Sequence, residues 1–359
     1  MVADVIKVIS PTAIAFFVGM AISPIVTHYL YKYTCWKKKA GKVGYAGGDT
    51  PIFNELHKDK EVGTPRMGGI VIWGSVILTI AGIWVLERIF GGAALEKLEF
   101  FSRSQTWVPV FALLVGAGVG LIDDILEIRG TGTHFAGGLP LSRRLVVVAG
   151  VCLFAAWWFY DKLGVTTVSI PFNGVVQLGV FFIPFFVLVG LAVYASGVID
   201  GIDGLAGGVF AIIFASYGVI AFSQQQLDLA AFCGTVSGGL LAFLWFNIPP
   251  ARFYMGETGV MGLTMALTVT AFMTDALGGG KGVAVLPMIG FPLLATVLSD
   301  VIQVLSKKFR GKKVFLVAPI HHHFEAKGWP PYKVTMRYWV LSVITAFIGV
   351  IVALAGTLL

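Results

Sequence analysis

Ten apolar segments, each close to the length that crosses a bilayer, constrain this chain more than any other feature of its sequence. About 20 apolar residues span a hydrocarbon layer of about 30 Å. Hydrophobic residues make up 57% of the 359 residues and charged residues only 13%, whereas a soluble domain carries about 25%. The sequence therefore predicts an all-α, polytopic integral membrane protein in the lipid bilayer, with a single domain over residues 1–359.

The predicted transmembrane helices cover most of the chain. Their expected ranges are 10–30, 68–86, 107–125, 143–161, 179–198, 205–222, 229–246, 260–276, 284–304 and 335–357. The first segment resembles a signal peptide in length, but it has little positive charge before it and no small-residue cleavage site after it. We expect it to be a retained helix.

The distribution of basic residues predicts how the helices are oriented. With the N-terminus outside, 20 of the 26 Lys and Arg residues fall in inner loops, so both termini are expected outside. The net charge of +7 then belongs to the cytoplasmic membrane surface and gives no indication of nucleic-acid binding. Among the short outer loops, residues 165–174 (VTTVSIPFNG) read as a possible β-hairpin because a β-branched run ends in Asn-Gly.

Two pairs of carboxylates lie at the ends of apolar segments on the predicted cytoplasmic side. Asp123-Asp124 ends the third segment, and Asp200-Gly201-Ile202-Asp203 joins the fifth and sixth. A solvated helix end and an N-cap are the ordinary structural explanations. Negative charge is unfavourable at a helix C-terminus, however, and two acids framed by glycines exceed what one cap requires. Both pairs are therefore candidate functional groups.

Three further motifs fall on the same predicted side. Glu257 lies in MGETG and is either a first-turn helix acid or a ligand of a hard cation such as Mg²⁺. His321-His322-His323 cannot all point one way, so we expect phosphate contacts or proton transfer from one or two of them and no three-His zinc site. The motif GTPRMGG (63–69), with Thr64 and Arg66, is typical of a backbone-amide turn bearing one cation.

Together these motifs indicate phosphoryl transfer. Carboxylates that hold Mg²⁺, with basic groups that neutralise phosphate oxygens, are the usual components of such sites. Their position at a membrane surface indicates one lipid substrate and one cytosolic, phosphorylated substrate.

The motifs also carry a resemblance to a known family. GTPRMGG at 63–69, the Asp pair at 123–124, DGIDGLAGG at 200–208, LWFN at 244–247, MGETG at 255–259 and PIHHHFEAKGW at 319–329 span nearly the whole chain. They resemble the polyprenyl-phosphate N-acetylhexosamine-1-phosphate transferase superfamily and, through the HHHFE loop, its phospho-N-acetylmuramoyl-pentapeptide transferase branch.

This resemblance implies a reaction in a bacterial cytoplasmic membrane. Undecaprenyl phosphate would attack the β-phosphate of UDP-N-acetylmuramoyl-pentapeptide, giving lipid I and UMP with Mg²⁺ as cofactor, and a homodimer is possible. Asp123 or Asp124 would accept the lipid phosphate's proton or position that phosphate. The expected catalytic residues are Asp123, Asp124, Asp200, His321, His322 and His323; the expected metal ligands are Glu257 and Asp200; the expected substrate-binding residues are Asp203, Gly201, Arg66, Thr64, Arg143, Arg144, Asn247 and Lys327.

The chain departs from the family pattern at several of these motifs. It has Tyr194-Ala-Ser-Gly197 where relatives generally carry Asn, Glu127 where Lys is common, and Glu257 where Asp is usual. Two other functions remain open: a sister enzyme with UDP-N-acetylglucosamine or a similar donor, and an ion-coupled transporter. A transporter would place its acids near the bilayer midplane in a repeated architecture.

Overall fold

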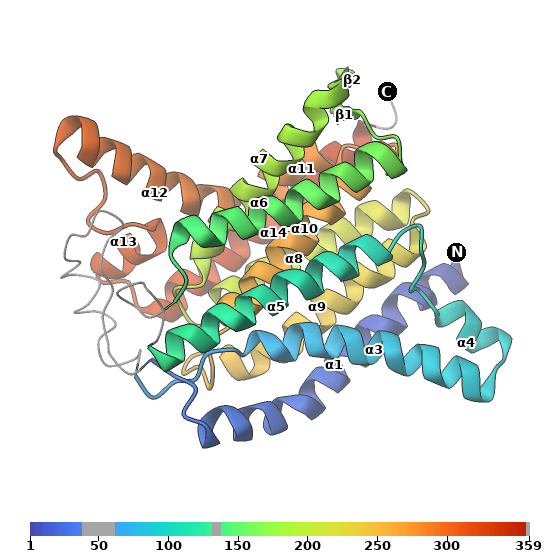
Figure 1. Cartoon of the computed structure of the whole chain (residues 1–359), viewed down its shortest axis with the longest axis horizontal. Helices are drawn as coiled ribbons and strands as arrows, with labels where there is room; N and C mark the ends of the chain where they lie inside the picture. The colour runs from blue at the N-terminus through green and yellow to red at the C-terminus, as the bar shows by residue number, and fades with distance from the viewer. Residues whose placement is uncertain (38–61, 131–137, 357–359) are drawn as a thin grey trace.

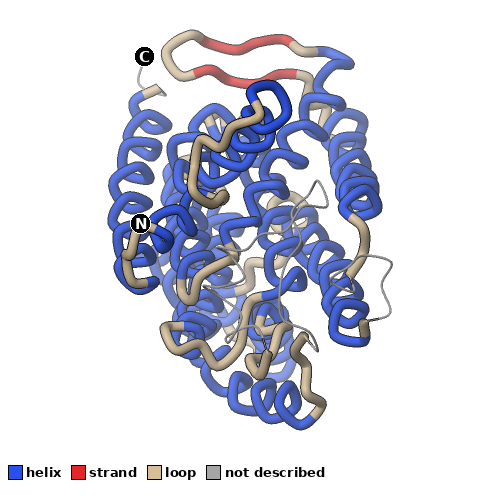
Figure 2. Tube along the Cα trace, turned by 90° about the vertical axis from the view of Figure 1, so that its left-hand side faces the viewer, coloured by secondary structure: helices blue, strands red, loops and turns tan. Residues whose placement is uncertain are grey.

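The computed structural model describes residues 1–37, 62–130 and 138–356 and forms one bundle of long helices (Figures 1 and 2). The helices are α1 (Val2–Lys32), α3 (Gly69–Phe90), α4 (Ala93–Leu98), α5 (Trp107–Arg129), α6 (Leu141–Trp157), α7 (Phe182–Ala195), α8 (Leu205–Ser223), α9 (Leu227–Asn247), α10 (Gly256–Met273), α11 (Gly282–Ile289), α12 (Phe291–Arg310), α13 (Ile320–Ala326) and α14 (Pro331–Ala355). Short turns of other helix types lie at 158–162, 179–181, 196–199 and 276–278.

Helix α10 lies at the centre of the bundle. Every residue of α10 except Glu257 is buried. Two of its threonines bond within the helix, since the hydroxyls of Thr264 and Thr268 donate to the carbonyls one turn earlier, each at 2.8 Å. Such intrahelical bonds lower the cost of enclosing polar side chains in a buried helix.

Helices α5 and α10 pack closely at their site ends. A Cβ atom at Gly120 would lie 2.1 Å from the carbonyl oxygen of Glu257, so only glycine permits this approach. The close contact brings the last turns of α5, which carry Asp123 and Asp124, against the first turn of α10.

The predicted membrane spans are largely confirmed. Eight helices among the described residues are long and apolar enough to cross a membrane, and the bent pair α11–α12 could be a ninth. The remaining expected span, 260–276, corresponds to the enclosed helix α10.

The expected span over 284–304 corresponds to a bent pair of helices. The helix breaks between α11 and α12, which meet at 74°. Pro292 explains the break because proline lacks the N–H that would continue the helical ladder across Gly290. Beyond the break, α12 projects away from the bundle toward α13 (Figure 1).

The predicted hairpin is confirmed at the other end of the bundle. Strands β1 (Thr167–Ile170) and β2 (Gly174–Gln177) are antiparallel, with Ile170 opposite Gly174. The N-terminus and the end of α14 lie toward the hairpin end of the bundle, whereas α13 lies at the opposite end (Figure 1). Asp275 joins the hairpin to the bundle, as one carboxylate oxygen accepts from the Ser169 amide at 2.8 Å and the other from the Val283 amide at 3.1 Å.

Candidate active site

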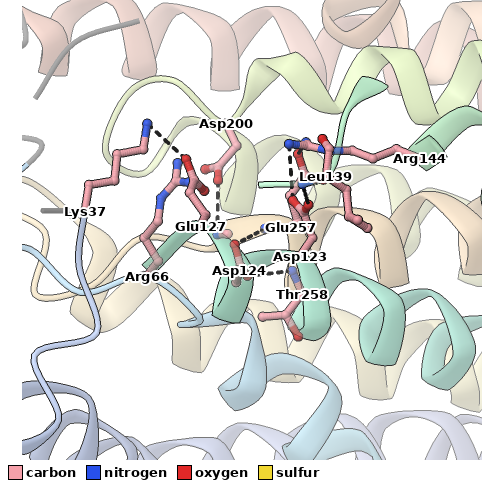
Figure 3. A network of polar contacts seen from close by, with 11 residues as sticks. Lys37, Arg66, Asp123, Asp124, Glu127, Leu139, Arg144, Asp200, Glu257 and Thr258 are labelled. Carbon is pink, nitrogen blue, oxygen red and sulfur yellow. Dashed lines mark hydrogen bonds and ion pairs between the residues drawn. The ribbon is translucent and has the colours of Figure 1, made fainter. Parts of the chain in front are cut away.

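Asp124 holds the first turn of α10. Its side chain is fully buried, and its two carboxylate oxygens accept hydrogen bonds from the amides of Glu257 at 3.1 Å and Thr258 at 2.9 Å (Figure 3). These amides are among those that a helix start leaves without an intrahelical partner. Asp124 therefore caps the N-terminus of α10. This role explains why a negative charge is kept near the C-terminus of α5, where the helix dipole disfavours it.

Asp123 lies beside Asp124 but faces different partners. Its Oδ1 atom accepts from the Leu139 amide at 2.6 Å. Its Oδ2 atom lies 3.3 Å from Nη2 of Arg144 and makes no hydrogen bond to any described residue. One oxygen of this fully buried carboxylate is thus committed to the backbone, and the other faces the site.

Glu257 and Asp200 complete the acidic centre. Oε1 of Glu257 lies 2.5 Å from Nη1 of Arg144, while Oε2 is buried and makes no hydrogen bond within the described part of the chain. Asp200 accepts from the Gly256 amide at 3.3 Å, so it lies next to the same helix start (Figure 3). Four carboxylates from three separate motifs therefore converge.

Glu127, about one helical turn after Asp124 in α5, pairs with two cationic side chains. It makes ion pairs with Arg66 and, at 3.1 Å, with Lys37, and both Glu127 and Lys37 are buried. The GTPRMGG turn that carries Arg66 is held by backbone bonds, from Gly68 N to Tyr254 O and from Tyr254 N to Pro65 O, each at 2.8 Å. Glu127, which stands where a lysine is common in the family, is thus neutralised by Lys37 and Arg66.

Two of the three histidines face the DGID loop. A Cβ atom at Gly201 would lie 2.7 Å from Nε2 of both His321 and His322, so this position requires glycine. His322 Nδ1 lies 2.6 Å from Oε2 of Glu325. His323 points elsewhere and accepts from the Leu316 amide at 3.1 Å, while burial and Lys327 lower the pKa of its imidazole.

Asp203 and Asn247 hold loops together beside this centre. Asp203 accepts from the Ala251 amide at 3.1 Å. The buried amide of Asn247 accepts from Gly204 N and donates to Phe253 O, each at 2.9 Å. Both contacts are with backbone, which points to positioning of the DGID loop.

The other residues expected to bind substrate lie around this centre. Arg143 and Lys327 are exposed at the surface, and Thr64 is partly buried in the turn before Arg66. Arg144 alone of the two consecutive arginines enters the acidic centre, where the Tyr194 side chain lies near it.

The carboxylate oxygens of the acidic centre are ligands of the type that Mg²⁺ takes. Mg²⁺ takes oxygen ligands, commonly one or two carboxylates plus substrate phosphates. Oδ2 of Asp123 and Oε2 of Glu257 are buried carboxylate oxygens without a hydrogen bond to a described residue. No three His, Cys, Asp or Glu side chains of the described segments form a complete metal site. The residues therefore fit an ion that takes its remaining ligands from substrate.

Comparison with known proteins decides the family. A model of glycosyl transferase family 4 matches residues 106–275. A phospho-N-acetylmuramoyl-pentapeptide-transferase from Clostridium perfringens is 31% identical over 347 residues, covering 96% of this chain and 98% of that protein. The chain belongs to the phospho-N-acetylmuramoyl-pentapeptide transferase family. Transferases of the same name from Thermodesulfovibrio yellowstonii and Levilactobacillus brevis are 33% and 32% identical, covering 88% and 83% of this chain and 86% of each of those proteins.

Three side chains at the site of this transferase family member were not predicted from the sequence. Glu325 had a local signal, because it follows His322 by three residues and these face the same side of a helix. Lys37 had none, since it begins a run of three lysines, and Tyr194 stood out only as a departure from the family's Asn. The resemblance itself is confirmed by the full-length relatives.

Proposed function

We propose that this chain transfers phospho-N-acetylmuramoyl-pentapeptide from its UDP derivative to undecaprenyl phosphate, forming lipid I and releasing UMP. Similarity to phospho-N-acetylmuramoyl-pentapeptide transferases along 96% of the chain carries this proposal. In the reaction an oxygen of the lipid phosphate bonds to the donor's β-phosphorus, and the bond from that phosphorus to the bridging oxygen breaks, so UMP leaves with that oxygen.

Asp123 is the proposed general base. Both oxygens of Asp124 are occupied by backbone amides, whereas Oδ2 of Asp123 has only the ion pair with Arg144. A base must lie within hydrogen-bond reach of the proton it takes, and Asp123 has an oxygen directed into the site. Asp123 would take the lipid phosphate's proton, while Asp124 keeps α10 in place.

Cations and imidazoles are proposed to bind the phosphates. Arg66, Lys37 and Arg144 bring positive charge to the acidic centre, and guanidinium groups suit paired phosphate oxygens. His321 and His322 direct Nε2 toward the Gly201 backbone, next to Asp200, where they would contact the donor. Mg²⁺, held by Glu257 and Asp200 together with substrate oxygens, would supply charge neutralisation for the diphosphate.

The proposed location follows from charge. Twenty of 26 basic residues fall in the predicted inner loops, which supports a site at the cytoplasmic face of a bacterial inner membrane. We also propose a homodimer, which rests on the family resemblance alone. Light scattering of the protein in detergent tests it. The acids gather at one end of the helices, which disfavours a transporter with midplane carboxylates.

Release of UMP from purified protein tests the function. The wild-type protein should release UMP from UDP-N-acetylmuramoyl-pentapeptide only with undecaprenyl phosphate and Mg²⁺ present, and should prefer this donor over UDP-N-acetylglucosamine. Asp123→Asn should lower kcat by at least about 100-fold, the lower range of general-base contributions. Asp161→Asn is the matched control, because Asp161 is a half-exposed acid far from the site. Turnover unchanged by Asp123→Asn would refute the assigned base.

A further inference from the structure

Arg144 occupies the space between two carboxylates that face the site. Nη1 lies 2.5 Å from Oε1 of Glu257 and Nη2 lies 3.3 Å from Oδ2 of Asp123 (Figure 3). Its Nε donates to the Leu139 carbonyl at 3.0 Å. The planar guanidinium is thus fixed by the loop before α6 and spans both acids with its two terminal nitrogens.

One of the expected metal ligands, Glu257, lies against this guanidinium. Asp124 has given both oxygens to the first amides of α10, and Asp123 has given Oδ1 to Leu139. Oδ2 of Asp123 and Oε2 of Glu257 remain as buried oxygens without a hydrogen bond to a described residue. An ion bound through Glu257 would lie within a few ångströms of a fixed positive charge.

Electrostatics opposes such joint occupancy. Like charges a few ångströms apart repel each other even in bulk water, and a divalent ion doubles the repulsion. Arginine stays protonated throughout the biological pH range, so it cannot relieve the repulsion by losing its proton. Metal binding at Glu257 is therefore weakened while the guanidinium stays in place.

We propose that Arg144 is the resident counter-cation of Asp123 and Glu257 and competes with the divalent ion for Glu257. This inference rests on the proposed function and adds its regulation. The donor's diphosphate offers the displaced guanidinium a new anionic partner, so metal and donor bind together, and the protein alone binds the metal weakly.

Binding of Mn²⁺, a paramagnetic substitute for Mg²⁺, tests the competition without any turnover. Free Mn²⁺ is measured by electron paramagnetic resonance with purified full-length protein in detergent and no nucleotide. Arg144→Gln should lower the Kd of Mn²⁺ at least about tenfold. Arg144→Lys keeps one charge but cannot bridge both acids, so its Kd should fall between the two. Arg129→Gln, which removes an exposed guanidinium at the end of α5, should leave Kd within about twofold of wild type.

The outcomes separate this inference from the proposed function. Unchanged or weakened Mn²⁺ binding in folded Arg144→Gln and Arg144→Lys proteins would overturn the competition, even if the wild type releases UMP. Tighter binding in these variants supports it, even if no UMP is released. Thermal unfolding shows which variants are folded. If Arg144→Gln does not fold, the charge-conserving variant Arg144→Lys is used for the test.

Discussion

Nδ1 of His322 lies 2.6 Å from Oε2 of Glu325, and both side chains are buried. The contact fixes the ring so that Nε2 faces Gly201. Glu325→Gln should lower kcat/KM by about 10- to 100-fold, because hydrogen bonds to charged groups contribute about 1.5–3 kcal/mol. Steady-state UMP release measures this loss.

The matched control for Glu325 is Glu96→Gln, in an exposed acid on α4. It should retain wild-type kcat/KM. If Glu325→Gln behaved like Glu96→Gln, the orientation of His322 by Glu325 would have no part in turnover.

Gly201→Ala should abolish measurable turnover. The added methyl group would lie 2.7 Å from both His321 and His322, so the loop or the rings must shift. Gly118→Ala in α5 is the control, since a Cβ there meets nothing within 4 Å and alanine favours the helix. UMP release and thermal unfolding of both proteins check this, and full activity of Gly201→Ala would contradict the packing described.

Glu127 and Arg66 should show strong energetic coupling. Glu127→Gln leaves Arg66 and the buried Lys37 without their shared counter-charge and should destabilise the protein by about 3 kcal/mol. Arg66→Gln should cost less, because Lys37 still neutralises Glu127. The double variant should be more stable than the sum of the single effects predicts, by about 1–3 kcal/mol.

Denaturant unfolding in detergent micelles measures this cycle. The control is Asp161→Asn, which breaks the exposed pair with Lys162 and should change stability by under about 0.5 kcal/mol. Additive effects of Glu127→Gln and Arg66→Gln would show that the pair contributes nothing specific.

Asp275 should make stability depend on pH. Burial raises the pKa of Asp275 from 3.8 to about 6, despite hydrogen bonds from the Ser169 and Val283 amides that lower it. The folded state therefore binds the proton more tightly than the unfolded state does. This contribution to stability is present below pH 4 and is lost as pH rises to about 6. Relative to wild type, Asp275→Asn should lack this fall in Tm between pH 4 and 6, and an identical pH profile would contradict the shift.

The sequence predicted the helices well because each is a long apolar run. It did not show the bend at Pro292, which breaks a run that otherwise reads as a single span. The hairpin was predictable because its turn signal and its β-branched strands are adjacent in sequence.

The sequence predicted which acids gather at the site but not which contacts each acid makes. Asp123 and Asp124 are neighbours in sequence, yet one faces the site and the other caps α10. That difference depends on the approach of α10 to α5, a contact between residues 133 or more positions apart. Lys37 likewise reaches Glu127 only through the fold.

Asp124 anchors the start of the most enclosed helix while lying beside the proposed base. A lineage that no longer needed the reaction could not discard this carboxylate freely, because its loss would also loosen the architecture. Degenerate descendants of such a protein should therefore keep Asp124 long after Asp123 or the histidines have drifted, and retention of that one acid is poor evidence that an enzyme is still active.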